Sequence, residues 1–289
     1  MIKRKERNDM KNYYVIMLSL ALIAGCAQEQ QEAAVIDELA PETADTLETT
    51  ESNQGFYQKE RIIEFMLCDE GSDYTDDSMR ALIDDWNTAI DSSENRMLAS
   101  YGLRPQYETD MFDGIWTLVW PDMETRDAGW EAWPENGGKA LREKYETVLT
   151  CQSETTYLYS GHTIAAPSSI WEGEPHFVSY HFCSFNEGVV GEDVQPVETK
   201  IAGWIEQYRQ TNSDDGMGLN GLTPLFDSRN PDDEIDDFDG VGMWAYRSVD
   251  DAKKFAEAWA ESDIQAEIDK VVSCEEYDFD MFIFRLPEA

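Results

Sequence analysis

Between residues 59 and 289, hydrophobic positions follow two patterns in turn, and the whole series occurs twice. Stretches 61–68 and 177–183 each have one fully apolar face at a spacing of two residues, which predicts a strand. After each stretch, apolar side chains recur every three or four residues, which predicts an amphipathic helix. The helical positions are Met79, Leu82, Ile83, Trp86 and Ile90 in the first series, and Val194, Val197, Ile201, Trp204, Ile205 and Tyr208 in the second.

Each series continues with matching elements, so that both read strand, helix, strand, strand, helix, strand. The later elements are a strand with Gly-Leu-x-Pro (102–105 and 221–224), a third strand (115–120 and 241–246), a helix beginning at Met123 or Val249, and a last strand (155–160 and 278–284). The two series therefore predict two units of the same topology.

A sequence repeat supports this interpretation. Residues 108–133 and 234–259, which are 126 positions apart, are identical at eight of 26 positions, where chance would give about two. Other residues recur in the same order: Cys68 with Cys183, Trp86 with Trp204, and Cys151 with Cys274. We therefore expect an internal duplication, with one repeat at 59–160, a linker at 161–175 and a second repeat at 176–289.

The predicted order of elements is that of the split βαβ, or ferredoxin-like, unit. Two such units in one chain resemble the dimeric α+β barrel superfamily, and residues 122–133, with Arg126 and Trp130, resemble the second helix of its NIPSNAP-like and antibiotic-monooxygenase-like domains. The resemblance implies an α+β fold in which two ferredoxin-like (βαββαβ) repeats form one pseudo-dimeric barrel. It also implies a monomer, because fusion replaces dimerisation. The second repeat departs from the helix motif, with Ala252 and Ala256 at the matching positions, and no catalytic residue carries over.

Residues 1–25 have the pattern of a bacterial lipoprotein signal peptide. A basic start precedes an apolar run at 15–24 that is too short to cross a membrane, and a Leu-Ile-Ala-Gly-Cys lipobox ends at Cys26. Residues 26–58, rich in Gln, Glu, Ala and Thr, predict a flexible acidic tether. We expect a chain anchored in the bacterial cell envelope through acylated Cys26, at the outer membrane, on a side that the sequence leaves open.

The chain is strongly acidic, with 60 Asp and Glu against 22 Lys and Arg and a net charge of −38. Loss of the signal peptide removes five basic and two acidic residues, which makes the net charge −41. Such a charge repels nucleic acid and anionic membranes, so neither is an expected partner. The acidic run 232–239 fails the EF-hand spacing and is interpreted as a solvated loop, with calcium binding left open.

In the first strand of each repeat, the fully apolar face is expected to pack on helices, which leaves the mixed face to line the barrel interior. Candidate ligand-binding residues on this inner surface are Glu64, Met66, Tyr157, Tyr159, His181 and Asp280. A buried carboxylate beside a histidine and phenols can act in general acid–base catalysis. The favoured alternative is that these groups simply hydrogen-bond to one another across the sheets, so no catalytic residue is assigned.

The three histidines, His162, His176 and His181, form no metal-binding spacing, so neither a metal site nor a haem or other cofactor is expected. Three functions remain open. The preferred one is a lipoprotein that binds a small, partly apolar ligand. The second is a cofactor-independent enzyme, monooxygenase-like or isomerase-like, that uses the same cavity, and the third is a structural or protein-binding module without a pocket.

Four cysteines remain besides Cys26, and they occupy matched positions in the two repeats. In a split βαβ sheet the first and last strands are antiparallel neighbours, so the end of the first lies beside the start of the last. Export to an oxidising compartment favours disulfides. We therefore predict the pairs Cys68–Cys151 and Cys183–Cys274.

Lipidation at Cys26 is tested by metabolic labelling of the full-length chain with palmitate. The label is expected in the wild type and lost in Cys26→Ala, because the lipid is attached to this residue. Cys68→Ala, which leaves the lipobox intact, is the control. Label retained in Cys26→Ala contradicts the lipoprotein prediction.

Overall fold

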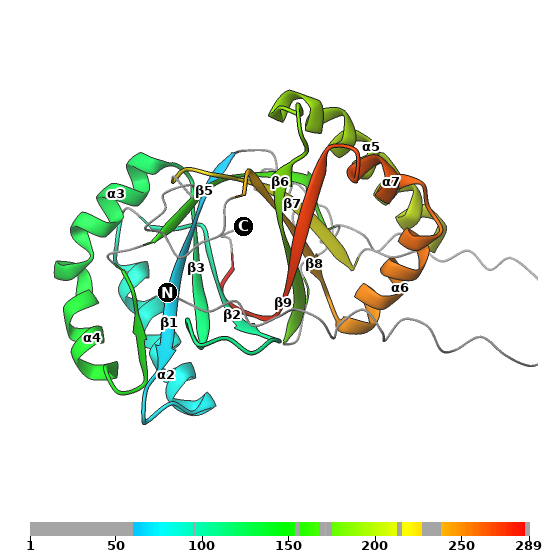
Figure 1. The fold of residues 1–289 in the computed structure, drawn as a ribbon. Helices are drawn as coiled ribbons and strands as arrows, with labels where there is room; N and C mark the ends of the chain where they lie inside the picture. The colour runs from blue at the N-terminus through cyan, green and yellow to red at the C-terminus, as the bar shows by residue number, and fades with distance from the viewer. Residues whose placement is uncertain are drawn as a thin grey trace, which may run out of the picture. The chain divides into compact units, whose positions relative to one another are not determined.

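The computed structural model describes residues 60–94, 96–153, 156–167, 171, 175–212, 216–226 and 238–286 (Figure 1). The predicted signal peptide, Cys26, the tether and residues 232–237 of the acidic run lie outside these ranges. Within them, no helix is long and apolar enough to cross a membrane.

Eight antiparallel strands close into a barrel, and a short additional strand lies beside it. The strands are β1 (Arg61–Glu70), β2 (Ala99–Pro105), β3 (Gly114–Trp120), β4 (Leu149–Cys151), β5 (Tyr157–Ala165), β6 (His176–Phe185), β7 (Met217–Pro224), β8 (Gly240–Tyr246) and β9 (Val272–Arg285). Neighbouring strands pair in the order β1-β3-β2-β9-β6-β8-β7-β5, and β5 pairs with β1 again, which closes the ring. The additional strand, β4, pairs with the end of β1.

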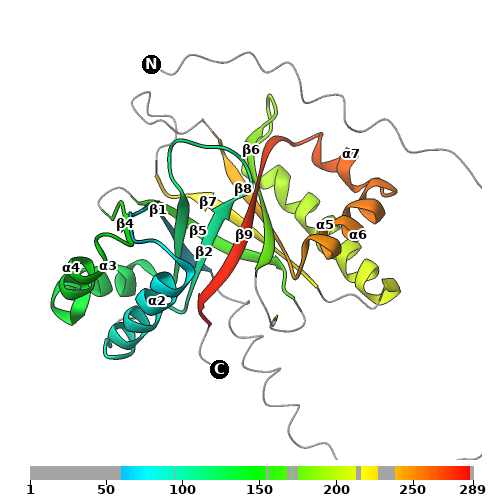
Figure 2. The same cartoon turned by 90° about the horizontal axis from the view of Figure 1, so that it is seen from below.

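The two halves of the barrel have the same strand order. In the first half, residues 60–165, the order is β5-β1-β3-β2, and in the second half, residues 176–286, it is β9-β6-β8-β7. The halves join through the pairs β2–β9 and β5–β7. In Figure 2, β9 runs between β2 and β6. The predicted α+β barrel is confirmed.

Helices cover the outside of the barrel. They are α2 (Asp76–Asp91), α3 (Met123–Ala132), the π-helical turn η1 (Pro134–Gly138), α4 (Lys139–Tyr145), α5 (Gly191–Asn212), α6 (Val249–Ala260) and α7 (Ile264–Ile268). Helices α2, α3 and α4 lie on one side of the barrel, and α5, α6 and α7 lie on the opposite side (Figure 1). Thr75, Asp122 and Ser248 start α2, α3 and α6, because each side chain accepts a hydrogen bond from the N–H three residues on.

Strand β5 continues to Ala165 instead of ending at residue 160, so it occupies the start of the predicted linker. It pairs with β1 on one edge and with β7 on the other, and the extra residues complete the second pairing. Gly161, the first residue of the predicted linker, lies inside this strand. A Cβ there would come within 2.9 Å of Ile63 Cγ1. The glycine therefore permits close packing inside a strand and does not mark a turn.

Both predicted disulfides are confirmed. Cys68 lies directly opposite Cys151 in the β1–β4 pair, and Cys183 lies opposite Cys274 in the β6–β9 pair. The sulfur–sulfur distances are 2.05 and 2.04 Å, and the bonds span 83 and 91 residues of sequence. Each bond therefore closes a long loop, which restricts the unfolded chain.

Three clusters of buried side chains make up the core. One fills the barrel interior and includes Phe65, Tyr159, Val178, Tyr180 and Phe279. The other two lie outside the barrel, one under the helices of the first half and one under those of the second. Each strand therefore has one face toward the barrel interior and one toward a helical layer.

The predicted facing of the first strands was wrong. Phe65 and Tyr180, expected under helices, point into the barrel, whereas Met66 lies beneath the helices of the first half. Both faces of β1 are buried, one in the barrel interior and one under the helices. The alternation of side chains along the strand therefore separates the two faces but does not tell which of them points into the barrel. The mixed face carries Glu64, whose carboxylate accepts hydrogen bonds from Arg126 and Trp130 of α3 and, within the described residues, none from across the barrel interior.

Candidate functional site

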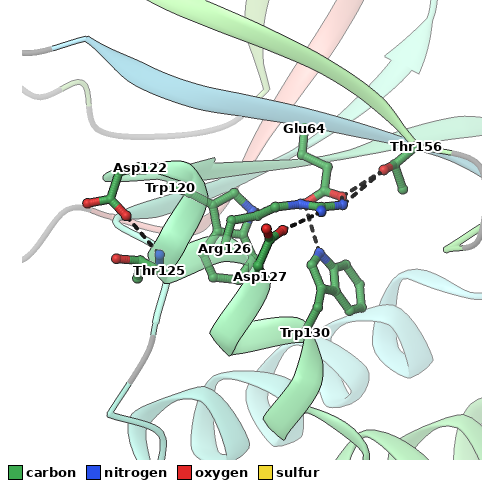
Figure 3. Close-up of polar contacts among 8 residues, drawn as sticks. All are labelled: Glu64, Trp120, Asp122, Thr125, Arg126, Asp127, Trp130 and Thr156. Atoms are coloured by element: carbon green, nitrogen blue, oxygen red, sulfur yellow. Dashed lines mark hydrogen bonds and ion pairs between the residues drawn. The ribbon is translucent and has the colours of Figure 1, made fainter. Parts of the chain in front are cut away.

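Glu64, near the middle of β1, is completely buried and faces α3. Its Oε1 accepts hydrogen bonds from Arg126 Nη2 at 2.6 Å and from Thr156 Oγ1 at 2.8 Å. Its Oε2 accepts hydrogen bonds from the indole nitrogens of Trp120 and Trp130, both at 2.9 Å. Figure 3 shows these donors converging on the carboxylate from the sheet and from α3.

The local structure brings the donors together. Asp122 accepts a 2.7 Å bond from the N–H three residues on, which starts α3 directly after β3 (Figure 3). Arg126 and Trp130 are four residues apart, so they lie on one face of this helix. Trp120 ends β3 on the sheet face that Glu64 also occupies. A short connection between β3 and α3 thus places three donors around one carboxylate.

The carboxylate of Glu64 has no acceptor capacity left. Four donors occupy its four lone-pair positions, and Arg126 supplies the opposite charge that a buried carboxylate requires. Burial lowers the pKa of Arg126, but the hydrogen bonds and the negative charges of Glu64 and Asp127 together raise it by more, so this pKa lies above its ordinary value. A general base or a metal ligand needs a free lone pair. Glu64 is therefore a positioning residue that fixes two indoles and α3.

Helix α3 depends on these polar bonds because it buries little apolar surface. Gly129 is its one fully buried residue, and it has no side chain to fill the space below the helix. A cavity of about 700 Å³ lies in this region, between β1 and β3 on one side and α2, α3, η1 and α4 on the other. We call it the first-half pocket.

The first-half pocket is mostly aromatic and aliphatic. Five of the nine tryptophans line it: Trp86, Trp116, Trp120, Trp130 and Trp133. Its polar lining residues are Ser93, Asn136, Arg142, Glu146, Thr150, Gln152 and Ser153. The volume lies in the range of about 300–1,000 Å³ that is typical of small-molecule sites, and so does the combination of apolar walls with a few polar groups.

The matching space in the second half is filled. Phe255 stands 126 positions after Gly129, at the same place in the repeat. Its ring centroid lies 5.4 Å from that of Trp204, 5.8 Å from that of Trp244 and 5.5 Å from that of Trp259. In the second half, a phenylalanine thus packs among three tryptophans at the position that Gly129 holds in the first.

The polar anchor of α3 is also confined to the first half. The positions that match Glu64, Arg126 and Trp130 are held by Ser179, Ala252 and Ala256. The second half thus lacks the carboxylate and two of its donors. The first half thus has both the Glu64 hydrogen bonds and the glycine under α3, and the second half has different residues at all of these positions.

The structure does not bring the six predicted ligand-binding residues together. Tyr157 and Tyr159 belong to the cluster inside the barrel, where burial raises the pKa of Tyr159. Glu64 and Met66 lie on the opposite face, under the first-half helices. Of the six residues, Met66 lines the first-half pocket.

His181 and Asp280 lie on the outer face of the second half. Burial lowers the pKa of His181 to about 4, against a smaller opposing effect of Asp278. The imidazole is therefore neutral at pH 7, and its Nδ1, 3.8 Å from Glu276, forms no ion pair there. Asp280 accepts a hydrogen bond from Gln106 Nε2 at 2.7 Å. Neither residue is part of the lining of the first-half pocket.

One signal in the sequence could have located the site. Gly129 aligns with Phe255 in the repeat, which predicts less side-chain volume under the first of the two helices. Arg126 and Trp130 were recognised as a helix motif, but nothing in the sequence linked them to Glu64. That link depends on which face of β1 the helix covers.

The first-half pocket offers no imidazole to a haem iron or to a metal ion, because His162, His176 and His181 are not among its lining residues. Its cysteine, Cys151, is held in a disulfide. No three His, Cys, Asp or Glu side chains in the described part of the chain are grouped to hold a metal ion. These lining residues fit an organic ligand held by shape and surface contact.

Neither a protein-family model nor a curated protein matches this sequence. Solved structures are similar to it. Chlorite dismutase from Candidatus Nitrospira defluvii in complex with imidazole is 8% identical with a TM-score of 0.46, over 78% of this chain and 92% of that one. An anthrone oxidase-like protein is 12% identical with a TM-score of 0.44, over 78% and 91%. A heme-binding protein from Thermus thermophilus is 8% identical with a TM-score of 0.43, over 78% and 92%. At TM-scores below 0.5, these likenesses say nothing about ligand or activity here.

Glu64→Gln is expected to lower the free energy of unfolding by about 3 kcal/mol, because it removes the buried charge that Arg126 faces and turns an amide N–H₂ toward donors. Thr156→Val, which removes one donor of the four, is the matched control, with an expected loss of about 1 kcal/mol. Urea unfolding measures both. Equal losses in the two variants would show that the charge of Glu64 is not what holds α3.

His181 is expected to make stability depend on pH. Its folded-state pKa of about 4 lies below the unfolded value of about 6.5, so the unfolded chain binds the proton first as the pH falls. The stability contributed by the neutral imidazole is complete above pH 6.5 and is lost toward pH 4. Between pH 7 and 4, the wild type should lose up to about 3 kcal/mol more than His181→Gln in urea unfolding. Identical losses would contradict this assignment.

Proposed function

We propose that the chain is an envelope-anchored lipoprotein that binds a small, partly apolar ligand in the first-half pocket. The observation that carries the proposal is a pocket of about 700 Å³ lined by five tryptophans. Leaving this much aromatic surface in contact with water is unfavourable, and an apolar ligand removes it from water. The binding energy therefore comes mainly from buried aromatic surface.

The pocket replaces the barrel interior as the expected binding site. Aromatic rings fill the interior: the centroid of Phe65 lies 5.0 Å from that of Tyr159 and 5.6 Å from that of Tyr180. Tyr180 in turn lies 5.7 Å from Phe279. These are contact distances for aromatic pairs, so this interior acts as a core.

Binding is favoured over the two alternative functions. Acid–base catalysis needs a titratable group held out of water at the pocket, but Glu64 is saturated, and Glu146, which lines the pocket, is exposed to solvent. The Tyr145 hydroxyl lies 3.0 Å from the Ala81 carbonyl and 2.8 Å from Asp85, so it is engaged as well. A structural module without a pocket does not account for the unfilled space under α3. A phenylalanine at position 129, like Phe255 in the second half, would fill that space.

The proposal includes an origin for this architecture. We infer that residues 59–160 and 176–289 are ferredoxin-like repeats of the dimeric α+β barrel superfamily, joined by duplication. The shared strand order and the eight identities between 108–133 and 234–259 support this. One chain then supplies both halves of the barrel, so a monomer is expected. The lipobox ending at Cys26 supports an anchor in the outer membrane.

Gly129→Phe is expected to fill the first-half pocket as Phe255 fills its counterpart, and so to abolish ligand binding while the fold persists. Native mass spectrometry of the full-length chain purified from its own host should show bound mass on the wild type and none on the variant. Thermal unfolding of both proteins verifies that the variant is folded.

Gly203→Phe on α5 is the matched control, because a Cβ at this position meets no atom within 4 Å. It introduces the same side chain in the second half and should keep the bound mass. A wild-type chain without bound mass, or bound mass retained on Gly129→Phe, contradicts the proposed function.

A further inference from the structure

The tryptophans of the first-half pocket present ring surface and few hydrogen-bond donors. Trp116 Nε1 donates to Ser100 Oγ at 2.9 Å, and the indole nitrogens of Trp120 and Trp130 donate to Glu64. Three of the five indole N–H groups are therefore committed to the protein. What these side chains offer a ligand is carbon and π surface. An anionic ligand needs donors or positive charge, and three of the five indoles have no N–H left to donate.

The charge around the pocket is negative. Helices α2, α3, η1 and α4 carry ten acidic and five basic residues, a net charge of −5. One of the basic residues, Arg126, is neutralised by Glu64 at 2.6 Å and Asp127 at 2.9 Å. The charged residues that line the pocket are Arg142 and Glu146, one of each sign. The lining itself is balanced in charge, whereas the surrounding helices, at −5, and the chain as a whole, at −38, attract cations from solution.

We infer that the ligand is a flat organic cation, with its positive charge delocalised over an aromatic body or attached to it as a quaternary nitrogen. Indole faces attract cations through their quadrupole more strongly than other side-chain rings do. A neutral molecule of the same shape lacks this attraction, and an anion is repelled by the ring faces and by the acidic helices around the pocket. The inference rests on the proposed function, since it names the ligand class of the same pocket.

The test compares three probes of nearly equal shape by calorimetric titration of the full-length chain. They are 1-methylquinolinium, its uncharged carbon analogue 1-methylnaphthalene, and the anion 1-naphthoate. The cation is expected to bind roughly tenfold more tightly than its neutral analogue, and the anion is expected not to bind. Higher salt should weaken binding of the cation and leave that of the neutral probe unchanged.

Trp133→Leu removes one pocket indole that takes no part in the Glu64 network. It should lower the affinity for 1-methylquinolinium by roughly tenfold and that for 1-methylnaphthalene by less. Trp259→Leu, which removes a tryptophan from the filled second half, should change neither affinity. The salt series on the wild type gives an independent result if Trp133→Leu fails to fold.

The outcomes separate the two proposals. If 1-methylnaphthalene or 1-naphthoate binds as tightly as the cation, the charge preference is overturned while ligand binding in the pocket stands. If none of the three probes binds and the chain carries no mass from its host, the proposed function is overturned together with this inference. If Trp259→Leu loses cation binding and Trp133→Leu keeps it, the cation binds in the second half, and its assignment to the first-half pocket is overturned.

Discussion

The first half of this protein depends on one carboxylate that is sealed from water. A buried charge is tolerated only when opposite charge and hydrogen-bond donors surround it, and Glu64 takes its donors from β3, from α3 and from the segment before β5. These bonds set where α3 lies over the sheet. Because Arg126 and Trp130 attach the helix, it does not need a large apolar side chain against the sheet. Gly129 keeps that position empty, and the pocket results from the way in which the helix is held.

The two halves solve the same physical problem differently. Each must attach its second helix to the outer face of a barrel. The first half does so with a buried ion pair and leaves space beneath, whereas the second half inserts Phe255 among tryptophans. Packing of aromatic side chains gives stability without a cavity. The buried ion pair is the more demanding arrangement, since each partner is destabilising without the other. Among the described residues, the ion pair of Glu64 and Arg126 occurs in the half that also has the pocket.

Much of the fold could be predicted from the sequence, because periodicity and repetition are local signals. The strand and helix order followed from them, whereas the closed α+β architecture was implied by the resemblance to the dimeric α+β barrel superfamily. Cys68 and Cys151 could be paired because the first and last strands of a split βαβ unit are antiparallel neighbours. The facing of β1 could not be predicted. Both of its faces are buried, so Phe65 and Met66 are equally apolar whichever layer they meet. That single ambiguity placed Glu64 and His181 inside the barrel and led away from the pocket, although the exchange of Gly129 for Phe255 was visible in the sequence.

The pairing of β9 with β2 has a consequence for the order of events when the chain folds. Phe284, near the end of β9, packs in the helical layer of the first half with its ring 4.8 Å from that of Trp116. Asn87 of α2 donates a 2.8 Å hydrogen bond to the Phe284 carbonyl across 197 residues of sequence. The core of the first half is therefore completed by a segment that lies 197 residues further along the chain. Contacts of such long range form slowly. Until β9 pairs with β2, the first half lacks Phe284 against Trp116 and the hydrogen bond to Asn87, so its outer core stays incomplete.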